Sequence, residues 1–95
     1  MLVIGILEGV ATAILFIAIN FSAGNILIVA MGILTASVFS GKLTGAHLNP
    51  TLTLAVLICE GFDKITVNLK LTFVMIFSQI IGGFAGSYFS LLFLG

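Results

Sequence analysis

Charged side chains are the scarcest part of this sequence. Three basic and three acidic residues make up 6% of the 95 residues, whereas 61% are hydrophobic and the mean hydropathy is +1.42. Soluble domains carry about 25% charged residues, so the composition indicates a chain that lies in a lipid bilayer. The formal net charge of zero leaves no basic surface for phosphates, which excludes nucleic acid as a partner. A single Cys and a single His give neither an internal disulfide nor a cluster of metal ligands, and we expect no metal or other cofactor.

Basic residues are also missing from the N-terminus, where none precedes Lys42. A secretory signal needs a positively charged first segment, so we interpret the apolar N-terminus as a retained helix. Long apolar stretches cover residues 2–20, 26–43 and 71–94, and each is near the ~20 residues that cross a bilayer. The sequence therefore predicts an all-α membrane protein, a single transmembrane repeat over residues 1–95 with three transmembrane helices.

One further apolar stretch, residues 50–58, is only about half as long as a membrane span at ~1.5 Å per residue. Its start is marked by cap chemistry, because Asn49 is a good N-cap and Pro50 suits the first helical position. The glycine-rich approach over residues 41–48 is not helical in character. Irregular backbone at membrane depth is tolerated only inside protein or beside a water-filled cavity. We therefore predict a re-entrant loop that leads into a half-helix over about residues 50–58, with its positive end at the bilayer midplane.

The re-entrant stretch also carries a motif. Residues 45–53 read Gly-Ala-His-Leu-Asn-Pro-Thr-Leu-Thr and follow Ser40 and Gly41. Together they resemble the first Asn-Pro-Ala box of the aquaporin and glycerol-facilitator family, also called the major intrinsic proteins. Positions in the flanking helices are similar to the same family: Glu8 and Thr12 in the first, and Gln79, Gly82 and Gly86 in the third. The resemblance covers essentially the whole chain.

The resemblance implies a half-length channel. The family is built from two inverted repeats, each with three spans and one half-helix, and this chain is similar to the N-terminal repeat alone. A passive channel is implied, not an enzyme, for water and/or small neutral solutes such as glycerol, which forms only after pairing with a second half-channel. That partner is an inverted copy of the chain or a separate chain. The alternative is a non-conducting membrane subunit or a truncated fragment of an aquaporin-like channel.

The resemblance also implies which residues contact the solute. Asn49 caps the half-helix and aims a donor N–H into the pore, while carbonyl groups of residues 44–47 accept hydrogen bonds. Thr51 stands where the family usually has Ala. Val29 stands where the family commonly has an aromatic residue in its outer constriction, which favours glycerol over a narrow water filter. The implied pore or substrate-binding set is Asn49, Pro50, Thr51, His47, Ala46, Gly45 and Val29.

Glu8 is the most costly residue in the sequence, because a carboxylate inside a membrane helix is expensive and marks a functional position by default. The resemblance implies a structural brace that accepts backbone N–H bonds from residues 45–48. Gln79, Gly82 and Gly86 are given supporting roles as well. A proton-coupled carboxylate, as in small drug/proton antiporters, is the alternative, but those chains have four full spans and lack an Asn-Pro half-helix.

The Lys residues indicate an orientation. Lys42, Lys64 and Lys70 all lie in or beside the connection between the second and third spans, and the first connection has none. The positive-inside rule then places that connection and the N-terminus in the cytoplasm, and we expect an integral protein of the cell (plasma) membrane. Three Lys against three acidic residues is a thin bias, as a dimer of oppositely inserted copies would need.

Overall fold

Helices make up most of the described part of the chain. The computed structural model describes residues 1–61 and 65–94 and has no strand there. In chain order the helices are α1 (Leu2–Phe21), α2 (Ile26–Thr44), α3 (Pro50–Cys59) and α4 (Ile65–Leu94). The predicted all-α class is confirmed. The last helix begins at Ile65, before the apolar stretch that starts at Leu71, because a helix needs only backbone hydrogen bonds and can continue beyond its lipid-compatible part.

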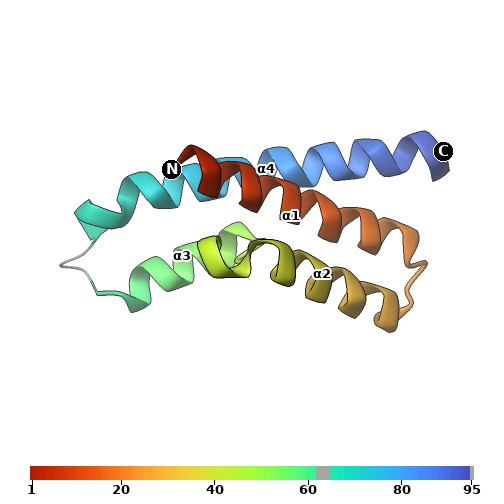
Figure 1. Ribbon diagram of the computed structural model, residues 1–95, viewed down its shortest axis with the longest axis horizontal. Helices are drawn as coiled ribbons and strands as arrows, with labels where there is room; N and C mark the ends of the chain where they lie inside the picture. Colours follow the sequence, from red (N-terminus) through yellow and green to blue (C-terminus); the bar gives the residue numbers. More distant parts are fainter. Residues whose placement is uncertain (62–64, 95) are drawn as a thin grey trace.

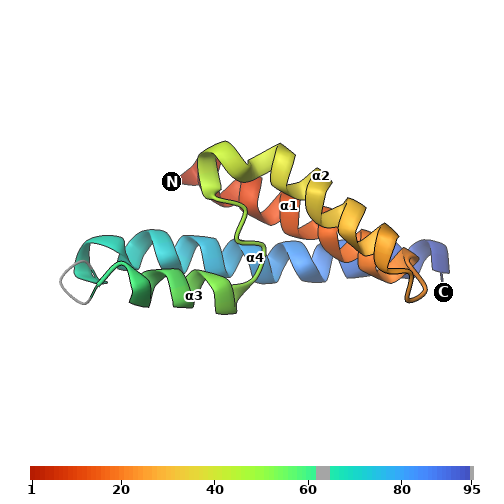
Figure 2. The same ribbon diagram turned by 90° about the horizontal axis from the view of Figure 1, so that it is seen from below.

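The helices lie in two crossing pairs. Figure 2 shows α1 with α2 in one layer and α3 with α4 in the other, and Figure 1 shows α1 lying along α4. The main helix contacts are α1 with α4, α1 with α2, and α3 with α4. The long helix α4 is thus packed against both α1 and the short helix α3.

The connection between α1 and α2 is fixed by local hydrogen bonds. Ser22 Oγ donates to Ile19 O at 2.7 Å, and Asn25 Oδ1 accepts the Leu27 N–H at 2.9 Å. Gly24 has a φ of +84°, a left-handed conformation that glycine adopts without steric cost. Such a tight turn places the two helices side by side and antiparallel.

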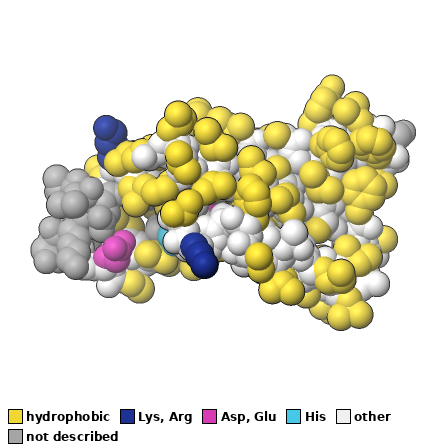
Figure 3. Space-filling model, viewed as in Figure 1, with side chains coloured by type: hydrophobic (Ala, Val, Ile, Leu, Met, Phe, Trp, Pro, Cys, Tyr) yellow, Lys and Arg dark blue, Asp and Glu magenta, His cyan; other side chains and the backbone are white. Residues whose placement is uncertain are grey.

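Three of the helices are long and apolar enough to cross a membrane: Leu2–Phe21, Ile26–Thr44 and the Leu69–Leu94 part of α4. In contrast, α3 has 10 residues, about half of the ~20 that a span requires. Hydrophobic side chains cover much of the face in Figure 3, and Ile26 and Val38 are 82% and 78% exposed. An exterior of this kind suits lipid.

The interior combines small residues with polar ones. Its buried hydrophobic residues are Ala11, Ala36, Leu48, Leu57 and Met75. Polar side chains are buried beside them, and the largest are Glu8 and Gln79, which are 0% and 2% exposed. Helices in lipid associate through close packing and hydrogen bonds, because lipid tails remove the hydrophobic driving force between them. The polar interior is therefore what a membrane protein of this size requires.

Glycines set the distance between α1 and α4. A Cβ built on Gly82 would lie 2.0 Å from the Gly9 carbonyl oxygen, and one on Gly86 would lie 2.5 Å from the Ala13 carbonyl oxygen. No side chain fits at these distances, so the two backbones touch. Small residues allow this close approach in membrane helices.

We expect Gly82→Ala to destabilise the protein by about 1–3 kcal/mol, the usual cost of overpacking a core, because its methyl group would overlap the Gly9 carbonyl group. The neighbouring Gly83→Ala is the matched control, since a Cβ there would meet the Phe16 ring at an ordinary 3.4 Å. Thermal unfolding in detergent, followed by circular dichroism, measures both variants. Equal melting temperatures for the two would contradict this packing.

Candidate pore site

The connection from α2 to α3 is an irregular segment that crosses between the two layers (Figure 2). Helix α2 continues to Thr44, so the expectation of non-helical backbone over residues 41–48 is wrong for residues 41–44, which keep their helical hydrogen bonds. Gly45 caps the helix with a left-handed φ of +78°, and its N–H donates to Gly41 O at 3.0 Å. Thr44 Oγ1 then accepts the Ala46 N–H at 3.0 Å. Ala46 and Leu48 also have positive φ angles, of 52° and 64°, which are uncommon for residues other than glycine. Tertiary contacts must hold such a backbone in place.

A buried carboxylate provides one such contact. Glu8 Oε1 accepts the Leu48 N–H, and it also accepts a hydrogen bond from Gln79 Nε2 at 3.1 Å. In addition, Thr12 Oγ1 donates to the Glu8 carbonyl oxygen at 2.8 Å. The expected contact of Glu8 with the backbone of residues 45–48 is therefore confirmed, at Leu48. Through it, α1 and α4 are both tied to the irregular segment.

Asn49 begins α3 in the way that cap chemistry predicts. Its Oδ1 accepts the Thr51 N–H at 2.7 Å and the Leu52 N–H at 3.4 Å, and Pro50 takes the first helical position. These bonds orient the side-chain amide and occupy its oxygen. Within the described part of the chain Nδ2 makes no hydrogen bond, so the exposed Asn49 side chain presents a donor at the start of α3.

The start of α3 lies level with the middle of α4. Gln79 is near the centre of α4, and its Nε2 donates to Oγ1 of Thr53, in the first turns of α3, at 2.7 Å. Figure 2 shows α3 running from this point back toward the start of α4. A helix that begins halfway along a membrane-length neighbour directs its free N–H groups and its positive dipole end at the middle of that neighbour.

Thr53 joins His47 to the same network. Its Oγ1 donates to Asn49 O at 3.3 Å, accepts from Gln79 Nε2, and lies 3.0 Å from His47 Nδ1. Because the hydroxyl group has one hydrogen, His47 Nδ1 is the donor in this arrangement. Thr53 is buried and His47 half-buried, so the imidazole is held against α3.

A groove of about 470 Å³ extends from the start of α3 between α1 and α4. Asn49, Pro50 and Gln79 line it, together with Thr12 of α1. The other predicted pore residues lie outside its lining: Gly45, Ala46, His47, Thr51 and Val29. Of these, Gly45 and Thr51 are exposed and the remaining three are half-buried. The structure therefore brings Asn49 and Pro50 together with Gln79 in the groove and leaves Val29 apart, on α2.

One residue of the site, Thr53, has no role among the sequence-based predictions. Thr53 connects α3 to Gln79 and His47, whereas the Leu48 N–H that Glu8 accepts falls within the expected residues 45–48. A weak signal exists for Thr53, which follows Asn49 by four residues and so lies on the same helix face as the cap. The left-handed conformation of Leu48 has no signal in the sequence.

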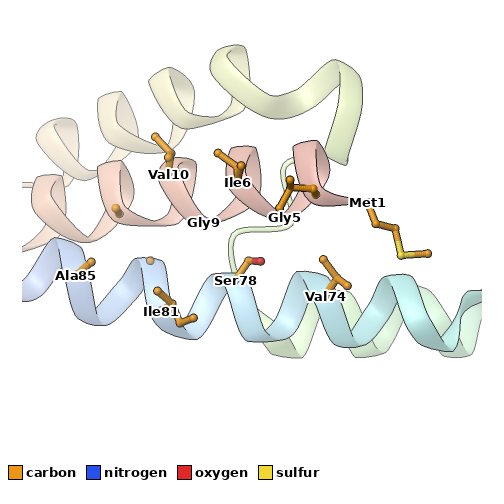
Figure 4. A pocket seen from close by; sticks show the side chains of 12 residues that line it. Met1, Gly5, Ile6, Gly9, Val10, Val74, Ser78, Ile81 and Ala85 are labelled. Atoms are coloured by element: carbon orange, nitrogen blue, oxygen red, sulfur yellow. The ribbon is translucent and has the colours of Figure 1, made fainter.

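A second hollow between α1 and α4 is larger, about 620 Å³, but differs in chemistry (Figure 4). Gly5, Gly9 and Ile81 are among its lining residues, and Ser78 gives the described lining its polar side chain. None of the predicted pore residues lines it. Its apolar walls suit lipid chains or another helix, so the groove at Asn49 is the candidate solute site.

Three membrane-length helices and a half-helix capped beside the middle of α4 define an integral membrane protein built from helices. More particularly, the model of the major intrinsic protein family matches residues 1–94, so the chain belongs to that family. Membership supports a channel or transporter role in general. Comparison with curated proteins gives no match, and comparison with solved structures gives none either.

We expect Thr53→Val to lower the free energy of unfolding by about 1–3 kcal/mol, because the change leaves the His47 Nδ1 and Gln79 Nε2 donors without their shared acceptor. Thr51→Val is the matched control, since it makes the same exchange on an exposed side chain of the same helix. Denaturant unfolding in detergent, followed by circular dichroism, compares the two variants. If Thr51→Val lowered the free energy of unfolding as much as Thr53→Val, the hydrogen bonds of Thr53 would not be the cause of the destabilisation.

Proposed function

We propose that this chain forms one half of a passive channel for water and/or small neutral solutes such as glycerol, and that it conducts only when paired with a second half. The Asn49 cap carries the proposal, because α3 holds Oδ1 and leaves Nδ2 as a donor opposite the middle of α4. The family match over residues 1–94 supports it, since it favours a channel in general.

Neutral solutes would pass this site by exchanging hydrogen bonds. A solute oxygen accepts a hydrogen bond from Asn49 Nδ2. The family resemblance implies that backbone carbonyl groups of residues 44–47, which lie outside the groove lining, accept hydrogen bonds from the O–H groups of the solute on its way to Asn49. A water molecule held in this way cannot relay a proton, and the positive N-terminal end of α3 repels cations. The site therefore suits neutral hydroxyl-bearing molecules and disfavours ions.

Val29 bears on the choice between water and glycerol. Its side chain is half-buried on α2, one turn after Asn25, whose carbonyl oxygen accepts the Val29 N–H at 3.3 Å. A Val side chain is smaller than the aromatic residue that the family commonly has at the matching position, so the outer constriction would be wider. For this reason we favour glycerol or a solute of similar size.

The charges support one orientation in the membrane. Lys42 and Lys70 are exposed, and Lys64 lies outside the described residues. On the face in Figure 3 the charged side chains lie in the half of the molecule where α3 and α4 join, and the opposite end shows none. By the positive-inside rule, we propose that this end and the N-terminus face the cytoplasm, with the protein in the plasma membrane.

We propose that the second half-channel binds in the groove beyond the start of α3. Helix α3 reaches α4 at Gln79, and beyond that point the groove continues past Ile80 and Phe84 to Ser87. A second half-helix placed end-on to α3 would lie in this groove and cover the polar groups near Asn49. Unsatisfied backbone groups in lipid cost several kcal/mol each, which favours a pair over a monomer. An inverted copy of the chain is the simplest partner, and a separate chain is the other.

Osmotic flux tests the role of Asn49. We expect Asn49→Asp to remove most of the water and glycerol flux, because Asp keeps the oxygen that caps α3 and replaces the Nδ2 donor by an acceptor. Asn25→Asp is the matched control, since Asn25 caps α2 through the same kind of bond, at 2.9 Å from the Leu27 N–H. Light scattering from vesicles that contain the purified chain measures the flux. Unchanged flux in the Asn49 variant would refute the donor role, whereas a folded native chain without flux would favour the non-conducting subunit or fragment.

Cross-linking tests the inverted pair. In the pair that we propose, the two-fold axis passes beside the α3 N-termini, so equivalent Cα atoms there should lie within the ~7 Å that a disulfide can bridge. We therefore expect Thr51→Cys, made together with Cys59→Ser, to give a disulfide-linked dimer in vesicles. Val38→Cys, on a side chain that is 78% exposed on α2, is the control and should remain monomeric on a denaturing gel. A monodisperse monomer that conducts would overturn the pairing.

A further inference from the structure

Two acceptor atoms in the network around Glu8 lack a donor. Glu8 and Gln79 are 0% and 2% exposed, and Glu8 Oε2 and Gln79 Oε1 have no hydrogen-bond partner among the described residues. The other polar atoms of both groups are engaged, because Glu8 Oε1 accepts two hydrogen bonds and Gln79 Nε2 donates to Glu8 and Thr53. The two unpaired acceptors therefore belong to side chains that are already bonded to each other.

The surrounding side chains do not supply the missing hydrogens. A buried polar atom without a partner is costly, and more so when it is charged. Lys42 and Lys70 are exposed, and the Thr12 hydroxyl donates its one hydrogen to the Glu8 carbonyl oxygen. The Thr53 hydroxyl donates to Asn49 O. With Glu8 ionised, a donor from outside this set of side chains is required.

We propose that a water molecule is bound between α1 and α4 as an internal part of the fold, where it donates one hydrogen to Glu8 Oε2 and the other to Gln79 Oε1. Water fits because it is small and carries two O–H donors, and buried waters in proteins typically bridge polar groups of this kind. Glu8 Oε1 and Gln79 Nε2 lie 3.1 Å apart, which keeps both acceptors in one part of the interface. The site is distinct from the Asn49 donor and does not depend on conduction.

The groove beside Asn49 gives the water a route to this site. Gln79 lines the groove, whereas Glu8 lies outside its lining. Water that enters the groove therefore meets Gln79 before Glu8. Once bound, the water adds a second bridge between α1 and α4 beside the direct hydrogen bond from Gln79 to Glu8. It thereby helps to hold the Glu8 carboxylate in the position where it accepts the Leu48 N–H.

Solid-state NMR of the chain in lipid vesicles tests the water site. The sequence contains two glutamates, Glu8 and Glu60, and one glutamine, Gln79. Carbon-13 labels at their side-chain carbonyl carbons therefore give one signal for each residue. We expect magnetisation from water protons to reach the buried Glu8 and Gln79 carbons as well as that of exposed Glu60, and not the methyl carbon of Met75, which is 4% exposed. Absence of transfer at Glu8 and Gln79 would overturn the proposal. A Glu8 carbon shift typical of a neutral carboxylic acid would overturn it too, because Glu8 would then supply the hydrogen itself.

The Glu8→Gln variant distinguishes two sources of the Gln79 signal, namely transfer from a bound water molecule and exchange of the Gln79 amide hydrogens with bulk water. The new amide keeps an oxygen for Leu48 and Gln79 but places an NH₂ group where Oε2 was, so the water loses one of the two acceptors that hold it. Water transfer to Gln79 should then fall, and the melting temperature should fall less than in Glu8→Leu, which leaves the Leu48 N–H without its acceptor. Undiminished transfer to Gln79 in the Gln variant would assign the signal to amide exchange and overturn the bridge. Where a variant does not fold, the measurement on the native chain decides.

Discussion

The hydrogen bond from the Leu48 N–H to the Glu8 carboxylate is the contact on which the rest of the site depends. Residues 45–48 are not helical, and the left-handed φ of Leu48 is unfavourable for a residue with a branched side chain. This segment keeps its shape only through partners outside itself. A carboxylate is a stronger acceptor than a neutral oxygen, and a low local dielectric strengthens the bond further. Because Leu48 directly precedes Asn49, the same bond fixes where α3 begins and how the Asn49 donor is placed.

Close helix packing makes this bond possible. Glu8 is next to Gly9 in α1, and Gln79 precedes Gly82 by about one turn in α4. Backbone contact between Gly9 and Gly82 therefore brings the carboxylate and the amide to 3.1 Å from each other. With a larger residue at either glycine, the helices would separate and the two side chains would no longer meet. Glycines and polar residues thus act together, since the former set the distance across which the latter bond.

The parts of the fold that depend on segment length and cap chemistry could be predicted from the sequence. The half-helix follows from Asn49, Pro50 and a short apolar run, and the burial of Glu8 follows from the cost of a carboxylate in lipid. The start of α4 at Ile65 could not be predicted, because hydropathy marks where a chain suits lipid and not where helical hydrogen bonding begins. The contacts of Thr53 could not be predicted either, since a Thr in an apolar helix suits a lipid-facing position as well as a buried one.

The position of Glu8 favours a fixed support over a proton carrier. A carboxylate that binds and releases protons during transport has to face the transported solute in at least one state. Glu8 is 0% exposed, lies outside the lining of the groove that contains Asn49, and accepts the Leu48 N–H. Turning it toward a solute would release Leu48 and with it the start of α3. One side chain cannot both move with a proton and hold the capped half-helix in place. The passive conduction that we propose requires a half-helix that is held in place.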